Sequence, residues 1–213
     1  MRPYYQSQMP SQFYNWTGLY LGGHGGYSWG KEREEYNDQF TPNYDRSIKM
    51  NGAIFGGHIG AQKQFGRFVF GVEADWTKTL QKGSSTEIGT NTTIDDPKLN
   101  WVGTARIRAG FLPFERVHVY GTAGGAYGML NNVHNEFTNS GAHLLKIDTK
   151  QALAGYTFGA GVEYALGNSW VVGAEWLHLN LNAIDTTMSG VSNSSYRETL
   201  TDNIFRGRIS FRF

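Results

Sequence analysis

Apolar and polar residues alternate one by one between residues 205 and 213. The odd positions of this stretch are Phe, Gly, Ile, Phe and Phe, whereas the even positions are Arg, Arg, Ser and Arg. Successive side chains of a β-strand point to opposite faces, so the pattern predicts a strand with one apolar face and one strongly polar face.

Seven further segments repeat this alternation. They predict strands over residues 17–29, 53–62, 68–76, 99–111, 117–127, 156–164 and 170–176. In all eight segments the apolar face, to which Leu99 is assigned, carries no charged residue, whereas the opposite face carries nine. Each predicted strand therefore separates an apolar environment from a polar one.

The connections between these strands alternate in length. Short turns are expected at residues 65–67, 112–116 and 166–169, and longer polar segments at about residues 30–50, 78–98, 130–150 and 182–202. Short turns favour antiparallel neighbours, and short turns at one end with long loops at the other are typical of bacterial membrane barrels. The sequence predicts an all-β fold, an eight-stranded antiparallel up-and-down transmembrane β-barrel over residues 16–213, preceded by a flexible N-terminal tail at residues 1–15.

Composition narrows the possible functions. The chain has no cysteine, which excludes disulfide bonds and thiolate metal sites, and its net charge of +1 argues against nucleic-acid binding. No apolar run approaches the roughly 20 residues of a membrane-spanning helix. The 28 glycines and the aromatic content of 15% suit many twisted strands better than helices or a disordered chain.

The polar face consists of arginines and carboxylates with almost no lysine. Arginine forms bidentate hydrogen bonds with carboxylates, which suits a confined interior. We therefore expect an interior ion network, made up of Glu73, Asp75, Arg106, Arg108, Glu163, Glu175, Arg206, Arg208 and Arg212.

Large aromatic residues lie at both ends of the apolar face. Ten residues separate Trp101 from Phe111, which at a tilt of about 40° spans roughly 25 Å, the height of a lipid-facing band. The aromatic residues expected at the two lipid interfaces are Trp29, Trp76, Trp101, Phe111, Tyr127, Tyr156, Tyr164, Trp170 and Trp176. A soluble barrel would bury its apolar face, whereas a barrel in a membrane turns it outward, and the charge-free face favours the membrane.

Several motifs in order give the chain a family resemblance. They are Trp16-Thr17-Gly18-Leu19-Tyr20-Leu21-Gly22-Gly23, Gly26-Tyr27-Ser28-Trp29-Gly30, the segments at 70–76, 119–125 and 159–164, and the terminal Arg212-Phe213. The chain resembles the small outer-membrane β-barrel proteins of alphaproteobacteria, which include surface antigens and hemin-binding proteins. These are related more distantly to opacity proteins and to the OmpA barrel.

The resemblance implies a location in the outer membrane of a Gram-negative bacterium, and a role in envelope integrity and surface interaction through four long extracellular loops. It implies an aromatic assembly signal near the C-terminus, formed by Phe205, Ile209, Phe211 and Phe213. The partners that it implies are outer-membrane lipids and lipopolysaccharide, the barrel-assembly machinery, and a host or envelope ligand at the loops.

Other functions are weighed against this structural one. The inward charges could line a passive pore for small solutes, but an eight-stranded interior is narrow enough for side chains to fill. Glu73 and Asp75 face Arg106 and Arg108 on the next predicted strand, so these charges are expected to pair rather than to catalyse a reaction.

The histidines do not form a metal or heme signature. His24, His58 and His118 are predicted to point inward, but nothing in the sequence places His118 near the other two. His134 and His143 lie in the third long segment, near Met129, and a heme ligand there is an alternative suggested by hemin-binding relatives. We expect no metal and no cofactor.

His178, just beyond Trp176, is the residue that hints at a lipid-modifying enzyme. A hydrolase also needs a nucleophile and an acid at matching places, and the sequence shows neither. We therefore expect no enzymatic activity.

Overall fold

The protein is described by a computed structural model for residues 14–37, 44–83, 85–88, 91–138, 143–183 and 195–213. The strands are β1 (Gly18–Asn37), β2 (Tyr44–Phe65), β3 (Phe68–Thr79), β4 (Lys82–Gly83), β5 (Ser85–Ile88), β6 (Asn91–Phe114), β7 (Val117–Thr138), β8 (His143–Ala165), β9 (Trp170–Ala183) and β10 (Ser195–Arg212). Within the described ranges, no helix is long and apolar enough to cross a membrane.

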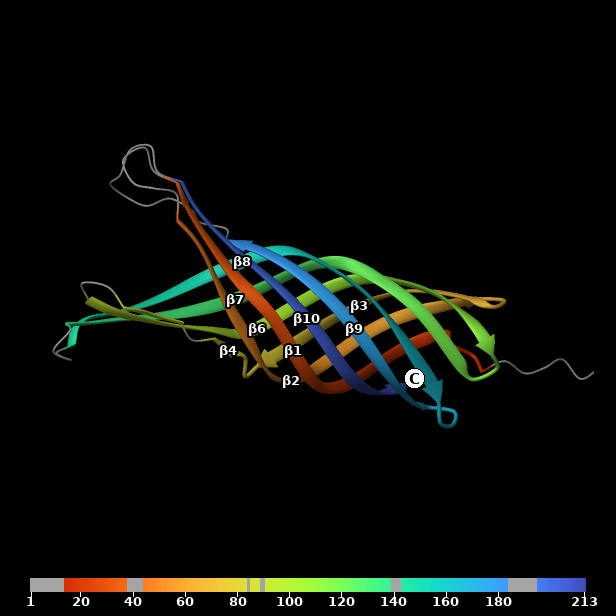
Figure 1. Ribbon diagram of the computed structural model, residues 1–213. Helices are drawn as coiled ribbons and strands as arrows, with labels where there is room; N and C mark the ends of the chain where they lie inside the picture. Colours follow the sequence, from red (N-terminus) through yellow and green to blue (C-terminus); the bar gives the residue numbers. More distant parts are fainter. Residues whose placement is uncertain (1–13, 38–43, 84, 89–90, 139–142, 184–194) are drawn as a thin grey trace, which may run out of the picture.

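Eight long antiparallel strands close into a barrel (Figure 1). Strands β2, β3, β6, β7, β8, β9 and β10 follow one another around the wall, and β1 closes it by pairing with both β2 and β10. The short strands β4 and β5 pair with β2 and β6 near one end. The predicted fold class and strand order are confirmed.

The two ends of the barrel differ, and they are called here the turn end and the loop end. At the turn end, short connections join β2 to β3, β6 to β7 and β8 to β9. The loop end holds the longer connections, but much of the sequence predicted there as loop is strand, because β1 continues to Asn37 and β7 to Thr138. Continued ladder pairing satisfies the backbone hydrogen bonds of these polar segments.

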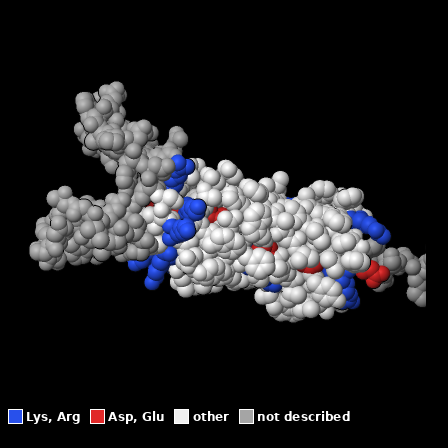
Figure 2. All heavy atoms as spheres, in the orientation of Figure 1, with Lys and Arg blue, Asp and Glu red and all other residues white. Residues whose placement is uncertain are grey.

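The outer wall is apolar and the interior is polar over the middle of the barrel. Phe70, Val72 and Ile107 lie exposed on the outside, with 66% of Ile107 accessible. Their chain neighbours Glu73 and Arg106 face inward and are 3% and 2% accessible. Figure 2 shows this wall as a surface of uncharged residues with most of the visible basic residues toward its two ends.

The interior changes character toward the loop end. Above the charged residues lies an apolar cluster, formed by Met50, Ile54, Leu99, Val102, Ala126, Leu130, Leu153, Leu177, Leu179, Leu181, Leu200 and Ile204. In β9, which continues beyond the predicted strand end at Trp176, the apolar side chains point inward at Leu177, Leu179 and Leu181. The barrel therefore has an apolar core above its ionic one.

Leu99 corrects one prediction of orientation. It was expected on the outer wall, but it is buried inside the barrel with 2% of its surface accessible. The pairing of β6 with β7 shifts register between Leu99 and Trp101, and the extra residue of such a bulge reverses the direction of the side chains beyond it.

The turn end is closed by residues that precede β1. Trp16 is fully buried there and packs in a second apolar cluster, with Val69, Leu112, Ala165 and Val171. Tyr14, placed by sequence in the flexible tail, donates its backbone N–H to the carbonyl oxygen of Glu115 at 3.1 Å. Residues 1–13 of that tail lie outside the described residues.

Candidate functional site

The site with the most chemistry is the charged interior of the barrel, and its centre is Arg106. Strand pairing sets Glu73 of β3 directly opposite Arg106 of β6. Nη2 of Arg106 lies 2.6 Å from Oε1 of Glu73 and 2.7 Å from Oδ2 of Asp75, while Nη1 lies 3.0 Å from Oε1 of Glu175. One guanidinium group therefore joins three carboxylates from two strands.

Two arginines of β10 reach the same carboxylates from the other side of the interior. Nε of Arg206 donates to Oε2 of Glu175 at 2.7 Å, and its Nη2 lies 3.1 Å from Oδ2 of Asp75. Arg208 donates to Glu175 at 3.0 Å and also to Glu73. The contacts with Asp75 and Glu73 cross the interior and join β10 to β3, which are not neighbours in the sheet, whereas Glu175 lies on the neighbouring strand β9, directly opposite Arg206.

Arg108 and Glu163 extend the network toward the turn end. Nη2 of Arg108 lies 2.7 Å from Oε1 of Glu163, and Nδ1 of His118 lies 3.2 Å from Oε2 of the same carboxylate. Eight of the nine charged residues predicted for the interior are thus brought together and are buried. They comprise four carboxylates and four guanidinium groups, so the network is electrically balanced.

Arg212, the ninth predicted member, lies apart from these contacts. Its guanidinium donates to the carbonyl oxygen of Trp16 and lies 5.4 Å from the centre of that ring. Its position at the end of β10 puts it at the turn end, below the four carboxylates. It therefore holds Trp16 in place rather than neutralising a carboxylate.

Two tyrosines belong to the network, although the sequence analysis did not assign them to it. The hydroxyl of Tyr20 donates to Glu73 at 2.8 Å, and that of Tyr120 donates to Glu175 at 3.0 Å. Gly60 and Gly161 lie opposite these tyrosines, and a Cβ atom at either glycine would overlap the tyrosine hydroxyl. A glycine directly opposite an inward tyrosine is a signal that could have revealed both.

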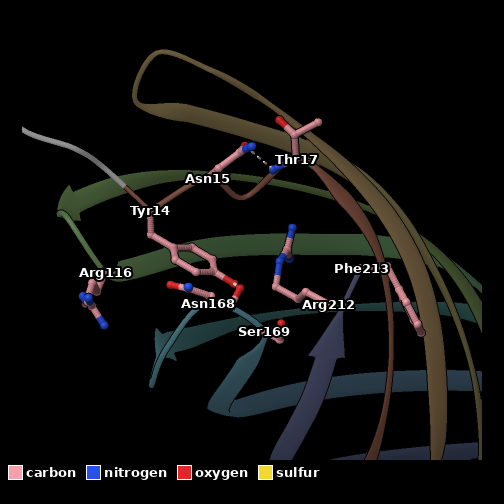
Figure 3. A pocket seen from close by; sticks show the side chains of 8 residues that line it. All are labelled: Tyr14, Asn15, Thr17, Arg116, Asn168, Ser169, Arg212 and Phe213. Carbon is pink, nitrogen blue, oxygen red and sulfur yellow. Dashed lines mark hydrogen bonds between the residues drawn. The ribbon is translucent and has the colours of Figure 1, made fainter.

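A small cavity opens at the turn end, beside Arg212 (Figure 3). It has a volume of about 520 Å³ and lies between Tyr14, Arg116, Asn168 and Arg212. Partial burial raises the pKa of Tyr14, against the opposing effect of Arg212. The phenol therefore stays protonated and donates to the carbonyl oxygen of Asn168 at 2.8 Å.

The three inward histidines lie in two separate places in the interior. Nδ1 of His24 lies 3.4 Å from Nδ1 of His58, whereas His118 contacts Glu163. No group of three metal-binding side chains occurs among the described residues. The side chains of His134 and His143 lie outside them.

His178 lies on the outer face next to aromatic rings. Its Nδ1 is 3.0 Å from Oδ1 of Asn203, and its ring centre is 5.0 Å from that of Phe158. An amide and an aromatic ring supply neither a nucleophile nor an acid, so these contacts do not assemble a hydrolytic triad.

The aromatic residues predicted at the lipid interfaces lie on the outer wall. Trp29, Trp76, Trp101, Tyr127, Tyr156 and Trp176 lie toward the loop end, and Phe111, Tyr164 and Trp170 toward the turn end. Phe205, Ile209 and Phe213 are exposed on the same outer wall, and the ring of Phe211 packs against Trp170 with centroids 5.2 Å apart.

Comparison with known proteins gives consistent matches along the chain. The model of the outer membrane protein β-barrel domain matches residues 6–213. The 31 kDa outer-membrane immunogenic protein of Brucella melitensis is 32% identical over 96% of this chain and 86% of its own length. The 22 kDa outer membrane protein of Rhizobium leguminosarum is 28% identical, over 86% of this chain and 74% of its own length.

Solved structures share the fold at low sequence identity. The outer membrane protein OprG from Pseudomonas aeruginosa is 12% identical, with a TM-score of 0.56 over 95% of this chain and 98% of its own. The outer membrane protease OmpT from Escherichia coli is also 12% identical, with a TM-score of 0.54 over 92% and 97%. At this identity the likeness concerns the fold alone.

The alphaproteobacterial resemblance seen in the sequence motifs is confirmed by the Brucella and Rhizobium relatives. The domain match covers the whole barrel, and the structure is a closed antiparallel barrel. The chain therefore belongs to the family of outer membrane proteins with a β-barrel domain and lies in the outer membrane of a Gram-negative bacterium.

Proposed function

We propose that the protein is a closed structural barrel that contributes to envelope integrity and presents its loops at the cell surface. The observation that carries this proposal is the filled interior. The ion network occupies the middle of the barrel, the apolar cluster lies above it, and Trp16 with its neighbours closes the turn end. Three successive layers of buried side chains favour a structural element over a pore.

The network also ties the barrel wall together. Arg106 of β6 contacts Glu175 of β9, and Arg208 of β10 contacts Glu73 of β3. These contacts brace strands across the interior, in addition to the hydrogen bonds between neighbouring strands. A barrel braced in this way resists deformation and is suited to an anchor.

Recording across a planar lipid bilayer tests the proposal directly. Purified, folded protein should give no large, steady conductance, because water and ions meet buried side chains at three levels. A stable channel from pure protein would contradict the closed barrel and favour the passive pore. As a control for insertion, protease added to one side should cleave the inserted protein.

The surface role rests on the loop end. In such barrels the long loops face outward, and the short turns face the periplasm. The Brucella relative is described as immunogenic, which supports surface exposure of the corresponding loops here. Protease added to intact cells should therefore cleave within the long segments at residues 30–50, 78–98, 130–150 or 182–202 and should spare the turns at Gly66 and Gly167. Cleavage at those turns in unbroken cells would reverse the proposed orientation.

The partner at the loops is proposed only as a host or envelope component. Pulldowns should test the folded protein against host extracellular components, heme and lipopolysaccharide. A loop-shortened variant of the same barrel should be tested against the same ligands for comparison. Retention that disappears with the loops would support a surface-interaction role. Equal retention by both variants would place the contact on the barrel wall.

A further inference from the structure

The pocket at the turn end is lined by two arginines that the proposed function does not use. Arg116 belongs to the turn between β6 and β7, and Arg212 is the last residue of β10. Figure 3 shows the phenol ring of Tyr14 between their side chains, and the centre of that ring lies 6.0 Å from the guanidinium carbon of Arg212. Segments far apart in the sequence therefore bring two positive charges to one pocket.

Neither guanidinium group is neutralised by the chain itself. Arg116 donates to the carbonyl oxygen of Ala165 at 3.5 Å, and Arg212 donates to the carbonyl oxygen of Trp16. Within the described residues, neither arginine forms an ion pair with a carboxylate. Residues 1–13 contain no aspartate or glutamate, so this segment cannot supply one either.

The rest of the pocket lining is polar and carries no acidic side chain. Beside Tyr14, the polar groups are amides and hydroxyls, which belong to Asn15, Thr17, Asn168 and Ser169. The lining keeps a net positive charge whether or not the terminal carboxylate of Phe213 is counted. Arg212 is buried, and a buried charge without an opposite charge is costly. An anion from outside the chain would therefore stabilise this end of the barrel.

The pocket lies outside the seal of the barrel interior. Trp16 is fully buried and packs with the apolar cluster of the turn end, so it separates the pocket from the ion network. In the proposed orientation the turns face the periplasm, and a ligand would reach the pocket from there. A volume of about 520 Å³ is larger than a single ion needs and suits a small molecule. Such a molecule would bind without passing through the barrel.

We propose that this pocket binds a small, water-soluble dicarboxylate, with one carboxylate at Arg116 and the other at Arg212. Guanidinium groups form bidentate, charge-assisted hydrogen bonds with carboxylates. The phenol ring separates the two guanidinium groups, which favours a molecule with two carboxylates over a single anion. The site goes beyond the proposed function, because a closed structural barrel needs no solute at its turn end.

The test is isothermal titration calorimetry of the folded protein in an uncharged detergent at low ionic strength, with glutarate as the probe. The monoamide of glutarate has nearly the same shape but one carboxylate fewer, so it should bind the unchanged protein at least about tenfold more weakly. Arg116→Gln should weaken the binding of glutarate by a similar factor. In this variant glutarate and its monoamide should bind almost equally, because the second carboxylate has lost its partner.

Arg67→Gln is the matched control, because Arg67 is an exposed arginine in another turn of the same end and does not line the pocket. This variant should bind glutarate like the unchanged protein, and heat-modifiable migration on a gel checks that each variant is folded.

Three results would overturn the proposal. They are the absence of glutarate binding, equal affinity of the unchanged protein for glutarate and its monoamide, and an equal loss of binding in Arg67→Gln. Inorganic phosphate that binds as tightly as glutarate would show a site for any single anion and would also overturn it. The closed barrel is tested by conductance instead, so the two proposals fail separately.

Discussion

The middle of the barrel interior and its loop-end half are filled by opposite chemistries. In the middle, four arginines and four carboxylates are buried in direct contact. Toward the loop end, the inward positions of the same strands hold mostly leucine, isoleucine and methionine, with Gln81 and Asp202 as a buried, hydrogen-bonded polar pair among them. Strand β9 contains both, since Glu175 belongs to the network and Leu177 to the apolar cluster.

The difference reflects what surrounds each part of the wall. Where lipid covers the outside, the apolar positions point outward and the interior receives the polar ones. Beyond the aromatic residues the outside meets headgroups and water, so the pattern inverts and the leucines point inward, as in a soluble protein. After Trp176 the outward positions are His178, Asn180 and Asn182, while Leu179 and Leu181 face inside.

The charged middle of the interior is called here the ionic half, and the cluster toward the loop end the apolar half. The largest expected effect comes from removing Arg106 from the ion network of the ionic half. Arg106→Met leaves three carboxylates without one of their partners, and removing one member of a fully buried ion pair typically costs about 3–5 kcal/mol. Adding Glu73→Gln should restore part of this loss, because one uncompensated charge is then removed. The free energy of unfolding in urea measures both variants.

Additive losses in the double variant would show that Arg106 and Glu73 are not coupled. An Arg106→Met variant with an unchanged free energy of unfolding would mean that water hydrates the carboxylates left without this partner. The contrast between the two halves would then disappear.

The apolar half should respond to loss of volume rather than loss of charge. Leu179→Ala removes a fully buried side chain and should cost about 3 kcal/mol in the same urea titration. Leu80→Ala is the control, because Leu80 is exposed at the same end and should change stability little. Equal, small effects in both variants would indicate that the loop-end interior is hydrated.

A smaller effect is expected from overfilling the ionic half. Gly60→Ala adds a methyl group against the hydroxyl of Tyr20 and should cost about 1–3 kcal/mol. Gly121→Ala places the same group on the outer wall, where the nearest atom is 3.9 Å away, and should be close to neutral. Thermal unfolding of the two variants in one detergent compares them, and a tolerated Gly60→Ala would show that both Tyr20 and the backbone oxygen of Val72 have room to move.

The smallest effect is expected where the two halves meet. Thr157 pairs with Leu179, and its buried hydroxyl has no hydrogen-bond partner within the described part of the chain. Thr157→Val removes this unpaired group at almost constant shape, so stability should stay equal or rise by up to about 1 kcal/mol. A clear loss of stability would reveal a partner for the hydroxyl, such as a bound water molecule.

Most of the ionic half could be predicted from the sequence, because it depends on alternation alone. Glu73 and Arg106 lie on consecutive long strands, so antiparallel pairing brings them together. Contacts across the interior, such as Arg208 with Glu73, depend on the curvature and closure of the barrel, which local patterns do not encode.

The apolar half was missed for two physical reasons. The bulge before Trp101 reverses the side-chain direction, and no residue type at that place marks it, so Leu99 was assigned to the wrong face. The inversion after Trp176 was visible as alternating leucine and polar residues, but the apolar residues had moved to the other face. At the opposite end, the turn end, Trp16 was read as part of a motif, whereas its burial depends on the turns that surround it.

The measurement that tests the filled and closed interior most directly is cysteine labelling, because the native chain contains no cysteine. Leu181→Cys and Asn182→Cys place thiols on adjacent residues of β9, one buried in the apolar half and one exposed on the outer face. With a membrane-impermeant maleimide on folded protein, position 182 should react rapidly and position 181 should react only after unfolding. Equally fast labelling of both positions in the folded protein would contradict a closed, water-free loop-end interior.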